Sequence, residues 1–315
     1  MAILWILLGL GALVLIIGFL CFLKAFYAPR GRKKDPEAIE IPKGEIYEVY
    51  REAMERWARE VRAMDHQVFT VQSFDGLTLY GNFYEYAPGA PIELMFHGYR
   101  GTAERDLSGG VQRCFRVGRS ALVVDQRCSG RSGGSVITFG VREHRDCLTW
   151  VDFMVKHFGP DVKIILTGIS MGAATVMTAA GKPLPPNVIG VLADCGFSSP
   201  EAIIREVIRQ MGIPDRLGYP FVRLGALIFG GFDPEETSAV EALKNARVPV
   251  IFYHGEDDAF VPCDMSRECY AACASQKRLV TVPGAGHGLS YPKDPEGYLG
   301  QLRDFFGPEA SHQKD

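Results

Sequence analysis

The sequence predicts an α/β fold in which a mainly parallel sheet is covered by helices on both faces. Short apolar runs such as 121–124, 163–167 and 248–254 alternate with longer segments of helical periodicity. Continuous apolar runs are typical of parallel strands, because helices bury both faces of such a sheet. Ligand sites in these sheets lie at the carboxyl ends of the strands. Glycine-rich motifs follow several of the runs, so we expect the functional residues to gather at that edge.

Composition excludes several classes of protein. The chain has 315 residues, of which 47% are hydrophobic and 23% are charged, with a formal net charge of −3. This balance, without an arginine-rich stripe outside the N-terminal region, gives no reason to expect nucleic acid as a partner. The eight cysteines form no CxxC pair and no zinc spacing with histidine. We therefore expect free thiols in a reducing compartment, and neither a metal nor a cofactor.

The N-terminal region, 1–34, is predicted to be a membrane anchor with a basic flank. Residues 2–23 carry no charge, and as a helix they would span about 33 Å, close to the ~30 Å of a hydrocarbon core. A cleaved signal peptide would have basic residues before its apolar run. The basic residues follow the run instead, at Lys24, Arg30 and 32–34. The positive-inside rule predicts a single-pass protein of the cell membrane with residues 35–315 on the cytoplasmic side.

Residues 35–65 are predicted to be a linker followed by an amphipathic helix. Apolar residues recur with a helical period between 45 and 64, and charged residues occupy the opposite face. Packing on the following domain is the first interpretation, and lying on the membrane surface is the second. Residues 66–315 hold the α/β domain. It includes an insertion at about 195–247 that we expect to cover the site as a small helical cap, because it exceeds the length of a crossover helix.

The central motif is the G-x-S-x-G at 168–172. A β-branched strand precedes it, and a run of good helix formers follows it at 173–180. This is the context of a nucleophile elbow, in which Ser170 would stand clear of the sheet on a strained turn. The flanking glycines, Gly168 and Gly172, are expected because side chains there would collide with strand and helix.

A serine nucleophile needs a base and an acid that orients the base. His287 lies in a glycine-rich loop after the last predicted strand, and this position favours it over His97 and His254, which each precede a glycine at a strand end. The acid should follow the strand at 248–254. Its loop offers Glu256, Asp257 and Asp258, and the residues alone do not choose between the last two. The backbone N–H of Met171, the residue after the nucleophile, is an expected oxyanion donor.

The order of strands, with an acid and a histidine after the serine, resembles the α/β-hydrolase superfamily over roughly residues 66 to 307. Within it the chain is most similar to the bacterial membrane-anchored serine aminopeptidase/esterase-lipase branch, which has an ITFG-type stretch, here 137–140. The resemblance implies that Asp258 is the acid, through the pattern HGxxDxxVP, and that the Tyr99 amide is the second oxyanion donor. In the loop at 125–132, cysteine and serine stand where the family has glycine and histidine, and we interpret this loop as architectural.

These residues predict a serine hydrolase that cleaves a carboxylic ester of a small-molecule acyl substrate through an acyl-enzyme on Ser170. A serine aminopeptidase and a thioesterase are alternatives on the same triad. The aminopeptidase would need an acidic patch, for which Glu201, Glu206 and Asp215 are candidates. A non-catalytic, membrane-tethered binding protein is a third hypothesis, which the presence of all three triad residues disfavours. The oligomeric state is left open.

Overall fold

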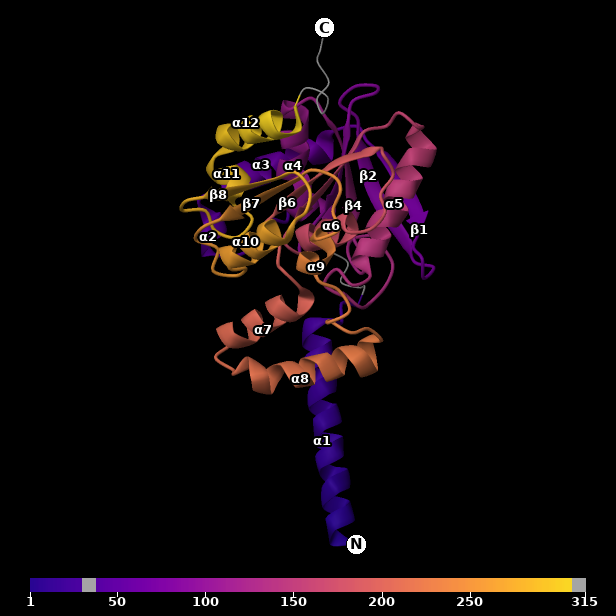
Figure 1. The fold of residues 1–315 in the computed structure, drawn as a ribbon, viewed down its shortest axis with the longest axis vertical. Helices are drawn as coiled ribbons and strands as arrows, with labels where there is room; N and C mark the ends of the chain where they lie inside the picture. The colour runs from indigo at the N-terminus through magenta and orange to yellow at the C-terminus, as the bar shows by residue number, and fades with distance from the viewer. Residues whose placement is uncertain (30–37, 308–315) are drawn as a thin grey trace.

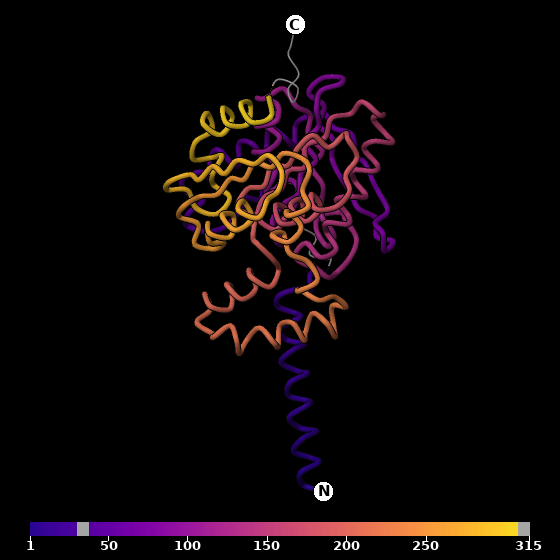
Figure 2. Tube along the Cα trace, viewed as in Figure 1, coloured from indigo at the N-terminus to yellow at the C-terminus, as the bar shows by residue number. Residues whose placement is uncertain are grey.

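The computed structural model describes residues 1–29 and 38–307, which form one eight-stranded sheet with helices on both faces (Figure 1, Figure 2). The strand order is β1-β2-β4-β3-β5-β6-β7-β8. The strands are β1 (Gln67–Gln72), β2 (Thr78–Tyr84), β3 (Ile92–Phe96), β4 (Ser120–Asp125), β5 (Ile164–Ile169), β6 (Val188–Asp194), β7 (Val250–Gly255) and β8 (Lys277–Val282). Pairs β1–β2 and β2–β4 are antiparallel and the other pairs are parallel. The predicted fold class is confirmed.

Two layers of helices cover the sheet, because alternate residues of the central strands point to opposite faces. Leu94 and Phe96 of β3 pack with α5 (Glu143–Phe158) and α6 (Met171–Ala180) on one face, which α9 (Ala239–Leu243) and α10 (Cys263–Ala272) complete. Met95 packs with α4 (Ala103–Arg116) on the other face, where α3 (Arg51–Ala63), α11 (Ser290–Lys293) and α12 (Pro295–Phe306) also lie. Nearly all the β3, β4 and β5 side chains are therefore buried.

The N-terminal helix α1 (Ala2–Ala25) is long and apolar enough to cross a membrane. Its first part projects from the rest of the molecule, and residues 2–16 are exposed (Figure 2). Its end is built into the domain. Phe26 is fully buried, with its ring packed edge-to-face on Phe139 and Phe232 at centroid distances of 5.7 and 5.1 Å. Tyr27 forms a β-bridge with Val136. The basic residues Arg30 and 32–34 lie outside the described residues.

The predicted amphipathic helix is two helices, α2 (Glu45–Glu48) and α3. Val49, between them, is exposed rather than part of an apolar face. On α3, Val61 is buried with the side chains of α4, and a Cβ atom on Gly109 of α4 would lie 2.8 Å from the Trp57 ring. The helix therefore packs on the domain, as the first interpretation expected.

The insertion after β6 contains α7 (Pro200–Gln210), α8 (Asp215–Gly225) and the π-helical turn η1 (Ala226–Gly230). In Figure 1, α7 lies between α8 and the sheet domain, and α8 crosses α1. The crossing is close because two glycines meet there. A Cβ atom on Gly225 would lie 2.3 Å from the Gly18 carbonyl oxygen of α1. The membrane-type helix is thus packed against the insertion as well as against the domain.

Candidate active site

Ser170 lies on a sharp turn between β5 and α6 with φ of 56°, a value in the left-handed region that is rare for non-glycine residues. The flanking glycines make this turn possible. A Cβ atom on Gly168 would lie 2.1 Å from the Gly172 carbonyl oxygen, and one on Gly172 would lie 2.0 Å from the Phe96 carbonyl oxygen. The elbow is therefore pressed against the carboxyl end of β3, and only glycine fits at both positions.

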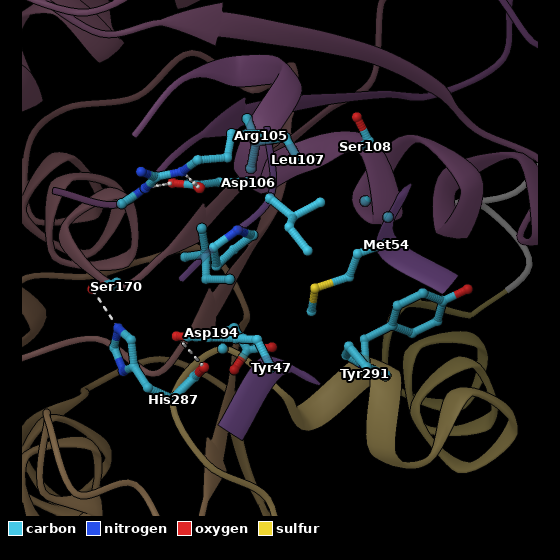
Figure 3. Close-up of a pocket in the computed structure, with 18 of the residues that line it drawn as sticks. Tyr47, Met54, Arg105, Asp106, Leu107, Ser108, Ser170, Asp194, His287 and Tyr291 are labelled. Atoms are coloured by element: carbon cyan, nitrogen blue, oxygen red, sulfur yellow. Dashed lines mark hydrogen bonds and ion pairs between the residues drawn. The ribbon is translucent and has the colours of Figure 1, made fainter. Parts of the chain in front are cut away.

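The structure brings Ser170, His287 and Asp258 into one hydrogen-bonded chain. His287 Nδ1 lies 2.7 Å from Asp258 Oδ2. On the other side of the ring, His287 Nε2 lies 2.9 Å from Ser170 Oγ (Figure 3). A carboxylate only accepts, so Nδ1–H donates to Asp258 and Nε2 accepts from the Ser170 hydroxyl. In this tautomer the imidazole is placed to take the serine proton.

Asp258 is buried and held as a carboxylate. Its Oδ1 accepts from the backbone amides of Phe260 and Val261, both at 2.9 Å. Burial raises the pKa of Asp258, but hydrogen bonds from His254, His287 and the Val261 amide outweigh burial and hold the pKa well below its usual range.

The two neighbouring carboxyl groups, Glu256 and Asp257, are exposed. Of the three acids in this loop, the structure therefore joins only Asp258 to the histidine. Burial, which the sequence does not reveal directly, distinguishes it from Asp257.

The two other histidines at strand ends are buried and do not take the place of His287 beside Ser170, although His254 Nε2 lies 3.3 Å from Asp258 Oδ2. His97 Nε2 accepts from the Gln126 amide at 3.0 Å, and its Nδ1 donates to the Gly98 carbonyl at 2.8 Å. His254 Nε2 donates to the Val261 carbonyl at 2.8 Å, while its Nδ1 accepts from the Ser266 hydroxyl at 2.6 Å. Both rings join the loops around the site and neither bonds to Ser170.

The loop that carries Tyr99 passes directly beside the serine. A Cβ atom on Gly98 would lie 3.5 Å from Ser170 Cβ. Met171 is the first residue of α6, so its amide has no carbonyl partner within the helix. Both candidate oxyanion residues therefore flank Ser170.

The side chains of this loop bind the end of the N-terminal helix. The Tyr99 hydroxyl donates to the Ala25 carbonyl at 2.7 Å, and Arg100 donates to the carbonyls of Lys24 and Tyr27, both at 3.0 Å. A helix end leaves its last carbonyls unsatisfied, and these donors satisfy them. The sequence did not predict this contact, because nothing in either segment signals the other.

A cavity of about 1270 Å³ extends from Ser170 and His287 along the sheet face covered by α3 and α4. Apolar side chains include Met54, Leu107 and Tyr291, which Figure 3 shows around it. Among the described residues, much of the cavity wall comes from residues 39–48 and from helix α3. The insertion at 195–247, all of which is described, contributes no residue to the wall. Residues 39–48 and α3 therefore cover the cavity. The insertion at about 195–247, which was expected to form the cap, packs against α1 instead.

Two polar side chains that line this cavity, Tyr47 and Asp194, were not predicted from the sequence as site residues. The Tyr47 hydroxyl donates to the His287 carbonyl at 3.0 Å, and burial raises the pKa of Tyr47 above its usual value. Asp194 ends β6 and accepts from the hydroxyls of Ser290 at 3.0 Å and Tyr298 at 3.1 Å. Burial raises the pKa of Asp194, and these hydrogen bonds offset only part of the rise.

Cys195 lies close enough to Asp258 and His287 for a ligand atom of each to lie within 4.8 Å of the others. Burial raises the pKa of the Cys195 thiol well above its usual value. His287 Nδ1 is also occupied by its bond to Asp258. These residues therefore fit a hydrogen-bonded triad with a buried thiol beside it better than a metal centre.

The loop at 125–132 is held by ion pairs and hydrogen bonds of its own. Arg127 pairs with Asp146 at 2.7 Å and with Asp75 at 3.0 Å. Asp125 accepts from the amides of Ala103 and Arg131, both at 3.1 Å. These contacts fix β4 to its neighbours, which fits an architectural role.

The acids considered for a peptidase patch lie on α7 and α8 and pair with arginine. Glu201 pairs with Arg205 at 2.7 Å, Glu206 pairs with Arg209 at 2.8 Å, and Asp215 pairs with Arg205 at 3.3 Å. None of the three acids lines the cavity.

Comparisons with known proteins agree with this architecture. An uncharacterised protein of Bacillus subtilis, YqkD, is 25% identical over 190 residues, 60% of this chain and 62% of that protein. An uncharacterised protein of Mycobacterium tuberculosis is 26% identical over 76% of this chain and 79% of its own length. A bifunctional esterase/perhydrolase of Acinetobacter calcoaceticus is 41% identical over 54 residues, 17% of this chain and 20% of that enzyme.

Solved structures share the fold at low identity. The Pyrococcus furiosus esterase Pf2001 matches with a TM-score of 0.64 and 19% identity, over 85% of this chain and 97% of that one. Est1E of Butyrivibrio proteoclasticus, solved with ferulic acid bound, matches with a TM-score of 0.57 and 20% identity, over 75% and 97%. The model of the alpha/beta hydrolase family matches residues 94–300, which include the elbow, Asp258 and His287. The chain therefore belongs to the alpha/beta hydrolase family.

Proposed function

We propose that this protein is a membrane-anchored serine hydrolase that cleaves carboxylic esters through an acyl-enzyme on Ser170. The observation that carries the proposal is the chain of hydrogen bonds from Ser170 Oγ through His287 to Asp258. His287 takes the hydroxyl proton as Oγ attacks the ester carbonyl carbon, and the developing oxyanion accepts from the amides of Met171 and Tyr99. His287 then protonates the departing alcohol. Water, activated by the same ring, releases the acid and regenerates the serine.

Asp258 holds the His287 tautomer and stabilises the imidazolium that forms during each half-reaction. Its lowered pKa supports this role, because the group stays ionised throughout the neutral range. Loss of one oxyanion donor typically lowers kcat by about 10²–10³-fold.

The cavity supports an ester with a sizeable apolar acyl group. At about 1270 Å³ it is larger than the ~300–1,000 Å³ of most small-molecule sites, and aromatic and aliphatic side chains form much of its wall. The pairing of Glu201, Glu206 and Asp215 with arginine leaves these acids poorly suited to hold a peptide amino terminus. Two of the similar proteins, Pf2001 and the Acinetobacter calcoaceticus enzyme, are named as esterases, which also supports ester cleavage as the proposed reaction.

The test uses a fluorophosphonate probe and nitrophenyl esters of graded acyl length on the full chain. We expect wild-type protein and the control Ser275→Ala, on the α10–β8 loop, to be labelled and active. Ser170→Ala should lose both properties while remaining folded. Retained labelling of Ser170→Ala would reject the nucleophile assignment, and turnover confined to aminoacyl amides would reject ester specificity.

We also propose that α1 spans the membrane and leaves the catalytic domain on the cytoplasmic side. The length of the uncharged segment and the basic residues after it support this orientation. A C-terminal reporter pair checks it: a fluorescent protein fused there should fluoresce and alkaline phosphatase should be inactive. The reverse pattern would contradict the orientation.

A further inference from the structure

Helix α8, turn η1 and the segment just before α8 carry a partly exposed apolar stripe, which reaches α1 at Leu224, where a Cβ atom on Gly18 would lie 3.4 Å from Leu224 Cδ2. Ile213, Leu217 and Ile228 are 42%, 62% and 52% exposed, and the half-buried Phe221 and Leu224 lie between them. From Leu217 onward these residues follow the spacing i, i+4, i+7 and i+11, which places them along one side of a helix, and Ile213 lies just before α8 begins. We refer to these five residues as the α8 stripe.

The other side of α8 is already covered. Tyr219 and Ala226 are buried in a cluster with Ile204 and Ile208 of α7 and with Phe22 of α1. Because α7 lies between α8 and the sheet domain (Figure 1), the uncovered side of α8 is turned away from the domain. It faces the direction in which α1 leaves the molecule.

The stripe is continuous with the exposed surface of α1. The rings of Phe19 on α1 and Phe229 on η1 meet edge-to-face with centroids 5.0 Å apart, and both side chains are partly exposed. The apolar surface that projects from the domain on α1 therefore extends sideways onto α8 and η1 without a polar break at this junction.

The position of α8 along α1 matches one boundary of a bilayer. The two helices touch at Gly18, and the sixteen steps from Ala2 to Gly18 span about 24 Å at ~1.5 Å per residue. If the start of α1 reaches one face of a ~30 Å hydrocarbon core, the axis of α8 lies about 6 Å inside the other face. Interfacial helices bury their apolar side to a depth of about 5–10 Å, so this position suits one.

We propose that the α8 stripe lies in the membrane interface and contacts lipid acyl chains of the leaflet on the side of the hydrolase domain. This inference rests on the proposed anchoring by α1. Interfacial helices of this kind place apolar side chains among the acyl chains and basic side chains among the head groups. Arg216 is exposed beside Leu217, and its long stem lets the guanidinium reach the head groups. In this position the insertion would limit how deeply the protein enters the bilayer.

The test reconstitutes the full-length protein in nanodiscs of phosphatidylcholine and phosphatidylglycerol that contain a phosphatidylcholine with a diazirine on its acyl chain. Irradiation links the acyl chain to whatever it touches, and mass spectrometry locates the adducts. We expect adducts on residues 3–16 of α1 and on the α8 stripe. Val49 and Val68, which are 85% and 47% exposed on other parts of the molecule, are matched controls and should gain none.

The outcomes separate this proposal from the one it rests on. Adducts on α1 without adducts on the α8 stripe would overturn the interfacial position of α8 and leave the anchor intact. Absence of adducts on both would reject the anchor itself. A photoreactive phenylalanine analogue in place of Leu217 adds a further check. Its cross-linking to a second copy of the chain, in place of lipid, would assign the stripe to a protein interface and overturn the proposal.

Discussion

Asp258 and Asp194 are both buried carboxyl groups near strand ends, yet their pKa values shift in opposite directions. Asp258 accepts from two backbone amides and from His287, and these bonds favour the charged form. Asp194 accepts only two hydroxyl bonds, which do not outweigh burial. A carboxyl group with a lowered pKa stabilises the fold above the unfolded pKa of about 3.9, whereas one with a raised pKa costs stability above it.

Asp194→Asn tests this difference through pH. The unfolded aspartate ionises at about 3.9, while the folded one resists ionisation. The wild type therefore loses stability relative to the variant as pH rises from about 4 through the folded pKa of Asp194. Urea unfolding at several pH values should show the difference between the two proteins growing in favour of the variant across that window. A difference that is constant with pH would contradict the raised pKa.

At the scale of single elements, the loop that carries Tyr99 and the end of α1 act on each other. The Tyr99 hydroxyl is bonded to the Ala25 carbonyl, and the same residue supplies the proposed oxyanion amide. Tyr99→Phe keeps the backbone and the ring but removes this bond, whose net worth is about 0.5–1.5 kcal/mol, together with the bond that the hydroxyl accepts from Arg100 Nε at 2.7 Å. We expect kcat to fall about three- to tenfold with little change in KM, because the amide matters most in the transition state.

The matched control for this variant is Tyr270→Phe. That ring lies on α10 beside Lys277 and does not line the cavity. Its ester kinetics should equal those of the wild type. Unchanged kinetics in Tyr99→Phe as well would mean that the α1 bond does not position the loop.

The crossing of α1 and α8 depends on Gly225. Alanine there would place Cβ 2.3 Å from the Gly18 carbonyl oxygen, so the helices would have to separate. Overpacking of this kind costs about 1–3 kcal/mol. In contrast, a Cβ atom on Gly300 of α12 would have no such neighbour within 4 Å, and alanine there should stabilise the helix by up to ~1 kcal/mol. Thermal unfolding in detergent should move in opposite directions for the two variants, and equal shifts would contradict the close crossing.

At the scale of the whole molecule, the first 26 residues divide into a projecting part and a docked part. Deletion of residues 2–16 removes only exposed side chains, whereas deletion of residues 2–28 also removes the buried Phe22 and Phe26. Each buried phenylalanine contributes about 1.5–3 kcal/mol. In detergent, the shorter deletion should unfold near the wild-type temperature and the longer one several degrees lower. Equal unfolding temperatures would show that the docked part does not stabilise the domain.

The sequence predicted the features that depend on residue patterns within a short segment. The elbow at Gly168 and Gly172 and the apolar strands each carry a local pattern, which is why the fold class followed from them. The packing of Phe26 on Phe139 and the bond from Tyr99 to Ala25 join segments more than 70 residues apart in sequence. Such contacts leave no periodicity to detect. For the same reason, the sequence did not show that residues 39–48 form part of the cavity wall.

The docking of α1 has a consequence for bilayers of different thickness. A free membrane helix adjusts to a thinner bilayer by tilting on its own. Here Phe26, Tyr27 and the crossing at Gly225 join α1 to the sheet domain, so a tilt of the helix also inclines the sheet and the mouth of the cavity. With α1 spanning the bilayer as proposed, a change of lipid chain length would turn Ser170 toward or away from the membrane plane.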